Sequence, residues 1–225
     1  MVDVPTQVAA YRADYRAEKV RPGYDGRLHL TATTSVGAGA LVACLLFVRD
    51  LTWLELSVVP LTYVFANLVE YLAHRHLMHK MVAPLSFLYR RHAAEHHRFF
   101  TQECMVVGST RDFAAVIFPL KVSFFFLGLV AAPSGLVVGW LLGSNAGWLF
   151  AATAVAYYQS YEALHLMAHL DPESPLGRRG VVRAIRHHHG IHHDTRRMRK
   201  ANFNITVPLW DLLLGTLDHQ WRPGE

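Results

Sequence analysis

The stretch LTYVFANLVEYLAHRHLMH, residues 61–79, decides the fold, because it joins an apolar segment to histidines at its end. The arrangement recurs: ten of the chain's 15 histidines fall into four short clusters, each beside a long apolar segment. The clusters are His74 and His79; His92, His96 and His97; His165 and His169; and His189, His192 and His193. Neutral imidazole binds zinc, copper, iron and nickel. With only two cysteines in the chain, so many imidazoles predict a metal centre of more than one ion.

Four apolar segments are each about as long as the roughly 17–25 helical residues that cross a hydrocarbon core. They cover about residues 28–48, 51–72, 113–142 and 148–169. Soluble helices of this length carry a polar stripe, which these segments lack. We therefore predict an all-α membrane protein in which residues 28–225 form one integral-membrane domain with four transmembrane helices. Pro119 and Pro133 interrupt the third segment, and we expect it to kink or split near residues 132–135.

The basic residues predict the topology. Of the 22 lysines and arginines, five precede the first span, six lie between the second and third, and nine follow the fourth. The positive-inside rule places these twenty residues, and all four histidine clusters with them, on the cytoplasmic side. We expect a helical cytoplasmic cap that holds the histidines. Because the basic residues follow membrane topology, the net charge of +5 does not indicate a nucleic-acid partner.

Residues 1–27 form a cytoplasmic N-terminal segment. Val4, Val8, Tyr11 and Tyr15 recur at helical spacing, which fits a helix lying on the membrane surface. A frayed tail is the alternative interpretation of the same residues.

Helical spacing brings most of the clustered histidines together in pairs. Residues three or four apart share one face of an α-helix. This spacing relates His92 to His96, His165 to His169, and His189 to both His192 and His193. Three of the four clusters can therefore direct two imidazoles at one point.

The first and last clusters leave their ligands open. His74 and His79 are five residues apart, about 140° around an ideal α-helix. They fit one metal only if the helix tightens or ends there; otherwise they face different metals, or His76 replaces His74. In the last cluster, His188 could replace His189.

Three carboxylates lie beside the clusters. Glu70 precedes His74 by one turn, Glu162 lies three residues before His165, and Asp194 adjoins His193. A metal-bound histidine usually donates its other N–H to a carboxylate or a carbonyl group. We expect Glu70, Glu162 and Asp194 to orient histidine ligands, with direct metal binding as an alternative.

Taken together, the boxes resemble the fatty acid hydroxylase/sterol desaturase superfamily, over about residues 58–217. They read HRHLMH (74–79), LYRRHAAEHH (88–97), YEALHLMAH (161–169) and HGIHH (189–193), and NFNITVPLWDLLLGT (202–216) resembles the closing segment of the family. The resemblance implies a four-helix membrane anchor beneath a cytoplasmic cap with a dimetal site. It also implies two iron ions as the working cofactors, although a purified sample could contain zinc.

The function implied by the resemblance is O₂-dependent hydroxylation of a C–H bond in a lipid from the bilayer. Two electrons must come from a separate donor, such as a ferredoxin or a cytochrome b5-like protein. Three residues separate His92 from His96, where carotenoid hydroxylases usually have two, which favours a fatty-acyl or sterol-like substrate. Lipid or sterol desaturation and carotenoid hydroxylation remain alternatives on the same site, and a non-enzymatic membrane metal-binding or transport protein is the alternative of another class. The excess of arginine over lysine favours a bacterial inner membrane over the endoplasmic reticulum.

Overall fold

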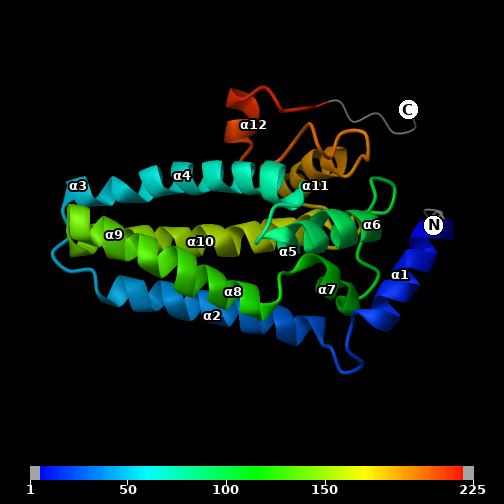
Figure 1. Cartoon of the computed structure of the whole chain (residues 1–225), viewed down its shortest axis with the longest axis horizontal. Helices are drawn as coiled ribbons and strands as arrows, with labels where there is room; N and C mark the ends of the chain where they lie inside the picture. Colours follow the sequence, from blue (N-terminus) through cyan, green and yellow to red (C-terminus); the bar gives the residue numbers. More distant parts are fainter. Residues whose placement is uncertain (1–5, 220–225) are drawn as a thin grey trace. The chain divides into compact units, whose positions relative to one another are not determined.

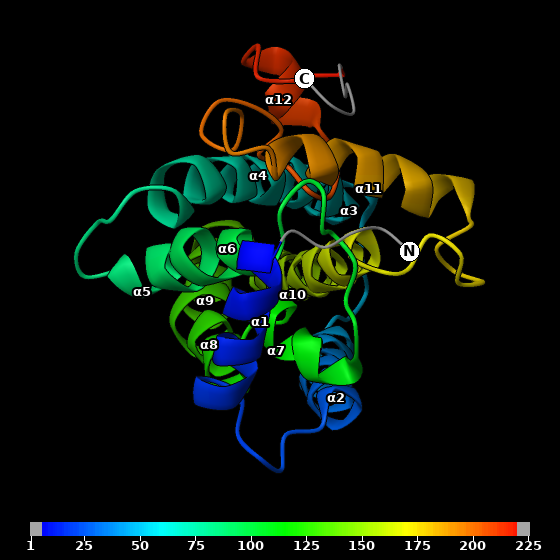
Figure 2. The ribbon, with the colours of Figure 1, turned by 90° about the vertical axis from the view of Figure 1, so that its right-hand side faces the viewer.

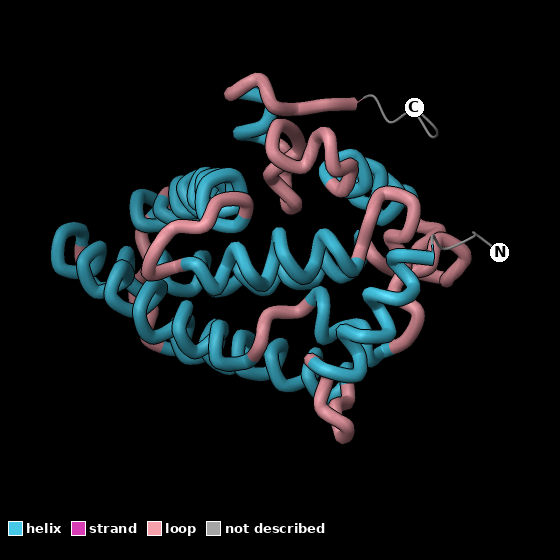
Figure 3. The backbone as a smooth tube through the Cα atoms, turned by 45° about the vertical axis from the view of Figure 1, so that its right-hand side comes forward, coloured by secondary structure: helices cyan, strands magenta, loops and turns pink. Residues whose placement is uncertain are grey.

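The computed structural model describes residues 6–219, and every regular element in that range is a helix (Figure 3). The chain divides into two compact units, which we describe separately. The span unit comprises residues 27–66 and 118–162, and the histidine unit comprises the described parts of residues 1–26, 67–117 and 163–225. Helices α4 (Val58–Ala73) and α10 (Ser144–Ala168) contribute residues to both units.

Apolar helices that run side by side build the span unit (Figure 1). Besides the first parts of α4 and α10, they are α2 (Gly26–Leu46), α3 (Trp53–Leu56), α8 (Leu120–Phe126), the π-helical turn η4 (Leu127–Ala131) and α9 (Ala132–Leu142). The glycines between α9 and α10 permit close packing, because a Cβ on Gly147 would lie 2.6 Å from the carbonyl oxygen of Gly135. Gly143, with φ of +100°, ends α9 and starts the turn into α10.

The surface of the span unit is apolar. Trp53 and Trp140 are 89% and 84% exposed, and many leucines and valines share that surface. Within residues 6–219, three helical segments are long and apolar enough to cross a membrane: Gly26–Leu46, Trp53–Met78 and Thr110–Leu142. These correspond to the first three predicted spans. An exposed apolar surface of this extent is stable in lipid and not in water.

The fourth predicted span, 148–169, corresponds to α10 and stays a prediction, because α10 is not among these three segments. In the span unit, α10 is the most buried helix: Ala152, Val155 and Tyr157 are each less than a tenth exposed. A helix surrounded by protein needs small side chains for close contact more than it needs large apolar ones. That requirement explains why its hydropathy is lower than that of its neighbours.

The third span breaks at another place than its prolines suggested. The chain is extended at Ile117 and Pro119, between α7 (Phe113–Val116) and α8, and continues as helix from α8 to the end of α9. The expected split near residues 132–135 is therefore wrong, whereas a kink there stays a prediction. The π-helical turn η4 ends two residues before Pro133, and such a turn accommodates the missing N–H and the ring of a proline within a helix.

Short helices and loops make up most of the histidine unit. Besides α7 and the ends of α4 and α10, they are α1 (Thr6–Glu18), the π-helical turns η1 (His74–Met78) and η2 (Arg90–His96), α5 (Ser86–Tyr89), α6 (His97–Phe99), the 3₁₀ turn η3 (Thr110–Asp112), α11 (Gly180–His192) and α12 (Leu209–Leu213). The N-terminal segment is helical over α1, which lies beside α6 and buries Tyr15 and Arg12 (Figure 2). Val4 lies outside the described residues.

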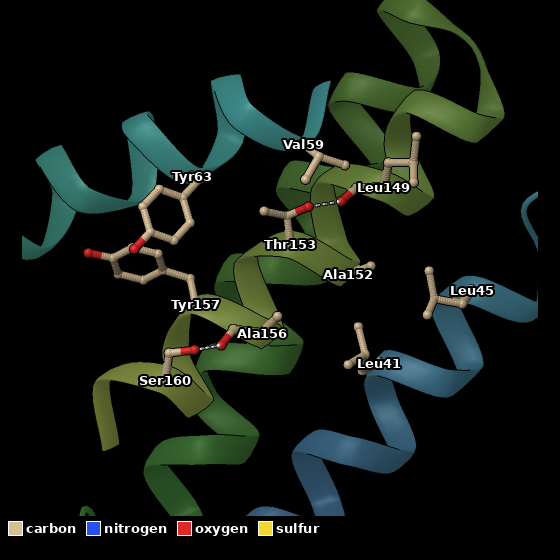
Figure 4. Close-up of a pocket in the computed structure, with 10 residues that line it drawn as sticks. All are labelled: Leu41, Leu45, Val59, Tyr63, Leu149, Ala152, Thr153, Ala156, Tyr157 and Ser160. Carbon is tan, nitrogen blue, oxygen red and sulfur yellow. Dashed lines mark hydrogen bonds between the residues drawn. The ribbon is translucent and has the colours of Figure 1, made fainter. Parts of the chain in front are cut away.

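A groove of about 320 Å³ opens on the span unit (Figure 4). Its lining comes from α2, α4 and α10 and is almost entirely apolar. The hydroxyl groups of Thr153 and Ser160 donate to the carbonyl oxygens of Leu149 and Ala156 in their own helix. Apart from the hydroxyl groups of Tyr63 and Tyr157, the groove therefore offers an occupant mainly dispersion contacts.

Candidate metal centre

A π-helical turn brings the first histidine pair together. Helix α4 changes into η1 at His74, where the backbone adopts i→i+5 bonding. Residues five apart then lie nearly above one another, and the rings of His74 and His79 stack with centroids 5.2 Å apart. The pair therefore meets because the helix widens. The expectation that the helix would tighten or end there is half right: it ends at Met78, with His79 as its C-cap, but its last turn widens instead of tightening.

A second π-helical turn rearranges the next cluster. In η2, His92 lies near His97, five residues along, and their Nε2 atoms are 3.0 Å apart. His96 instead approaches His165, with 3.1 Å between the Nε2 atoms. The rings of His92 and His96 stack with centroids 5.2 Å apart, but their ligand nitrogens belong to different sets, so the expectation that the pair points at one metal was wrong. The same holds for His189 and His192.

Nine of the ten predicted histidines form two sets, in each of which the ligand nitrogens lie within 4.8 Å of one another. The first set is His74, His79, His92, His97 and His192, and the second set is His96, His165, His169 and His189. His193 lies beside the second set, with its Nε2 2.9 Å from that of His189 and 3.2 Å from that of His96. Residues far apart in the sequence thus converge within one unit.

All ten imidazoles are buried, and burial keeps them neutral. Outside the membrane-spanning segments, burial is the main cause that lowers the pKa values of His79, His92, His96, His97, His189, His192 and His193. Repulsion between neighbouring histidines lowers the same pKa values further. A neutral ring carries one N–H and one lone pair, and the lone pair is what a metal ion requires.

Backbone carbonyl groups determine which nitrogen carries the lone pair. The Nδ1 atoms of five imidazoles donate to carbonyl oxygens: His74 to Phe203, His96 to Ala115, His169 to Met105, His192 to Ala201 and His193 to Phe100. In a neutral ring the proton on Nδ1 leaves Nε2 as the acceptor. These bonds therefore direct the five Nε2 lone pairs toward other imidazoles.

The arrangement fits metal ions. The Nε2 atoms of His96 and His193 lie 3.2 Å apart, and with both protons on Nδ1 neither atom can donate to the other. Two lone pairs at this distance repel each other unless a cation lies between them. Adjacent nitrogen ligands at about 2.1 Å from one octahedral ion are about 3.0 Å apart. The His79–His192 separation of 3.0 Å matches that value, and Nε2 of His169 has no hydrogen-bond partner among the described residues.

Comparison with known proteins agrees with this geometry. The family model described as fatty acid hydroxylase matches residues 59–216, which is more than half of the chain. The chain belongs to the fatty acid hydroxylase family. Its fold is similar to that of a solved structure of full-length Scs7p in which only the hydroxylase domain is visible. The TM-score is 0.60 at 18% identity, over 89% of this chain and 68% of that one. No match was found among curated proteins.

Membership in the fatty acid hydroxylase family makes the chain an oxidoreductase of the hydroxylase type. Its candidate membrane helices and its histidine sets, which are able to hold metal, agree with that class. The resemblance of the four histidine boxes to the superfamily is confirmed.

The histidines outside the two sets occupy other surroundings. His76 is exposed, whereas His74 belongs to the first set. His188 bonds through Nε2 to the carbonyl oxygen of Asn204 at 2.8 Å, whereas His189 belongs to the second set. The geometry thus favours His74 and His189 where the spacing left two choices.

The three predicted carboxylates contact other groups. Glu70 accepts hydrogen bonds from the N–H of Ile205 and from the hydroxyl of Thr206, the latter at 2.7 Å. Glu162, in the span unit, accepts from the N–H of Phe118 at 3.1 Å. Asp194 pairs with the guanidinium group of Arg196 at 3.1 Å. A role for each in orienting a ligand stays a prediction.

Sequence reasoning missed Asp211, which is fully buried. Its carboxylate accepts from the N–H groups of Phe203 and Asn204, at 2.9 and 2.7 Å, and from the hydroxyl of Thr216 at 2.7 Å. It therefore fixes the backbone whose Phe203 carbonyl holds His74. The only signal was an acidic residue in the apolar closing segment. The carbonyl partners give no signal, because every residue has a carbonyl group.

Proposed function

We propose that this chain hydroxylates a C–H bond of a membrane lipid, fatty-acyl or sterol-like, in an O₂-dependent reaction at two iron ions. The observation that carries the proposal is the inward-facing lone pairs of buried neutral imidazoles in two sets, with His96 and His193 facing each other at 3.2 Å. The family match and the hydroxylase neighbour support the reaction class. When bound, two iron ions supply the activation of O₂ that the attack on an unactivated C–H bond requires.

The residues of the chain position the metal ions and exclude water from them. The first set would hold one ion and the second set the other, with His193 completing the second. The carbonyl groups keep the ligand nitrogens unprotonated, and burial excludes water that would quench a reactive oxidant. Iron is favoured over zinc because zinc offers Lewis acidity only. Zinc bound in a purified sample would not contradict the proposal.

The remaining parts of the proposal concern location and partners. We propose that the histidine sets lie on the cytoplasmic side of the membrane, which the distribution of basic residues predicts. We propose a bacterial inner membrane because arginine outnumbers lysine. The substrate would then come from the bilayer. The two electrons that each turnover needs would come from a separate donor, a ferredoxin or a cytochrome b5-like protein.

The test combines metal content, O₂ uptake and product analysis in purified full-length protein. We expect about two iron ions per chain, O₂ consumption that depends on lipid and on an electron donor, and label from ¹⁸O₂ in a hydroxylated lipid. An unlabelled product with a new double bond would instead indicate desaturation. Bound metal without donor-dependent O₂ uptake would refute the oxygenase proposal and favour metal storage or transport.

The ligand assignment is tested by matched alanine variants. We expect His96→Ala and His165→Ala to lower the iron content and abolish product formation, because each removes a buried nitrogen from the second set. His29→Ala is the control, because the described contact of His29 is to the carbonyl oxygen of Phe118 in the span unit. Normal activity in His165→Ala would refute the assignment.

A further inference from the structure

Arg12 is a buried cation in an otherwise amphipathic N-terminal helix. It is 7% exposed, whereas Asp14 and Glu18 of the same helix are exposed. A guanidinium group has five N–H donors and a permanent charge, so its burial is costly unless those donors are satisfied. The contacts that satisfy Arg12 therefore indicate what it does.

Its donors bind one loop. Nε donates to the carbonyl oxygen of Phe99 at 2.7 Å, and the two terminal nitrogens donate to those of Cys104 and Val106, the latter at 3.2 Å. The guanidinium carbon also lies 4.9 Å from the ring centroid of Phe99 and 5.1 Å from that of Phe100. One side chain thus fixes both ends of residues 99–106.

The same loop supplies two of the carbonyl groups that orient imidazoles. Phe100 accepts from Nδ1 of His193 at 2.6 Å, and Met105 accepts from Nδ1 of His169 at 2.8 Å. Both carbonyls lie next to positions that Arg12 holds. The N–H of Val107 donates in return to the backbone carbonyl of His169 at 2.9 Å, so the loop and the end of α10 are fastened together.

We propose that Arg12 is a positioning residue for the second set: it holds the loop 99–106 so that the Phe100 and Met105 carbonyls direct His193 and His169 toward a bound ion. This inference rests on the proposed function, because it assumes that the second set binds metal. Lysine could not replace arginine fully, because a single ammonium group does not present the planar fork that spans three carbonyls.

The test measures how tightly the full-length protein binds each of two Zn²⁺ ions, by competition with a chromophoric chelator. Loss of a group that orients ligands typically lowers metal affinity by 10–100-fold. We expect Arg12→Ala to lower the affinity for one of the two ions by that factor and to leave the affinity for the other unchanged. General destabilisation would lower the affinity for both ions. A loss of affinity for one ion only therefore distinguishes a positioning role from a role in folding.

A second readout needs no metal. Hydrogen exchange of the metal-free protein, followed by mass spectrometry, should show peptides covering residues 99–107 exchanging about tenfold faster or more in Arg12→Ala. Peptides from α2 should not change. If wild-type protein binds fewer than two ions, the proposed function fails, and this readout still decides whether Arg12 holds the loop.

Arg16→Ala is the matched control, because Arg16 lies one turn along α1 and its guanidinium binds Asp112 at 2.7 and 3.0 Å. We expect Arg16→Ala to loosen α1 without lowering the affinity for either ion. The Zn²⁺ affinity and loop protection of Arg12→Lys should lie between those of Arg12→Ala and of the wild type. Arg12→Lys decides the question if Arg12→Ala does not fold. Wild-type affinity and loop protection in the Arg12 variants, or an equal effect of Arg16→Ala, would overturn the proposal.

Discussion

Replacing Asp211 with asparagine tests how the closing segment supports the first set. The substitution keeps the size of the side chain and one of its oxygens, but the other oxygen becomes an NH₂ group. That group would face a backbone N–H, of Phe203 or of Asn204, which the carboxylate accepts in the native protein. A hydrogen bond to a charged group contributes about 1.5–3 kcal/mol, and a buried donor left unpaired costs about 1–3 kcal/mol.

The expected loss of stability is therefore about 2.5–6 kcal/mol. For a chain of this size that corresponds to a decrease in the unfolding midpoint of roughly 5–24 °C. The Phe203 carbonyl, which accepts from Nδ1 of His74, lies on the disturbed backbone. We therefore also expect weaker metal binding at the first set. Thermal unfolding of the purified protein and its metal content measure the two effects.

Asp218→Asn is the control for this prediction. It is the same substitution nearby, but Asp218 is 30% exposed and pairs with Arg197 at 2.7 Å. Pairs of this kind contribute about 0.2–1 kcal/mol. If Asp211→Asn lowered the unfolding midpoint no more than Asp218→Asn, the reasoning that Asp211 fixes the 203–204 backbone would be refuted.

Three further predictions concern other parts of the molecule. Gly147→Ala should destabilise the protein by about 1–3 kcal/mol, because the added Cβ would meet the Gly135 backbone. Gly39→Ala is the control and should not destabilise the protein, because the space around its Cβ is open. Equal unfolding midpoints of the two variants would contradict the prediction. The metal-free protein should be most stable above about pH 6.5 and lose stability as the pH falls, because His92 and the other buried histidines have lowered pKa values and only the unfolded chain binds their protons. Each such histidine then lowers the free energy of unfolding by about 1.4 kcal/mol per pH unit. Equal unfolding midpoints at pH 7.5 and 5.5 would refute this prediction. Ala156→Trp, which fills the groove of the span unit, should lower the affinity for a long acyl chain and spare metal content, and unchanged affinity would count against acyl-chain binding in that groove.

The sequence predicted the helices of the span unit well, because bilayer thickness imposes a length that can be read from composition. Gly135 and Gly147 pack closely because they face each other from two helices, α9 and α10, and not as a stripe on one helix face. The sequence did not predict where the third segment breaks. Pro119 and Pro133 look equivalent in the sequence, but a π-helical turn accommodates Pro133.

Convergence of the ten histidines was predictable, whereas their division into sets was not. Wheel positions assume 3.6 residues per turn, and η1 and η2 depart from that value at His74 and His92. One wider turn exchanges the partners of His92, from His96 to His97. A π-helical turn is a local choice made for packing and ligand geometry, and no residue type encodes it.

The choice of carbonyl groups over carboxylates next to the imidazoles has a physical reason. A carboxylate beside a histidine raises the pKa of the ring, so protons compete more strongly with a metal ion for its lone pair. A carbonyl accepts the same Nδ1 proton without adding charge. The acidic residues of the histidine unit act one step further out: Glu70 and Asp211 accept backbone N–H groups of residues 203–206, and the Phe203 carbonyl in turn holds His74. The sets thus obtain rigid orientation from buried carboxylates while their own rings remain neutral.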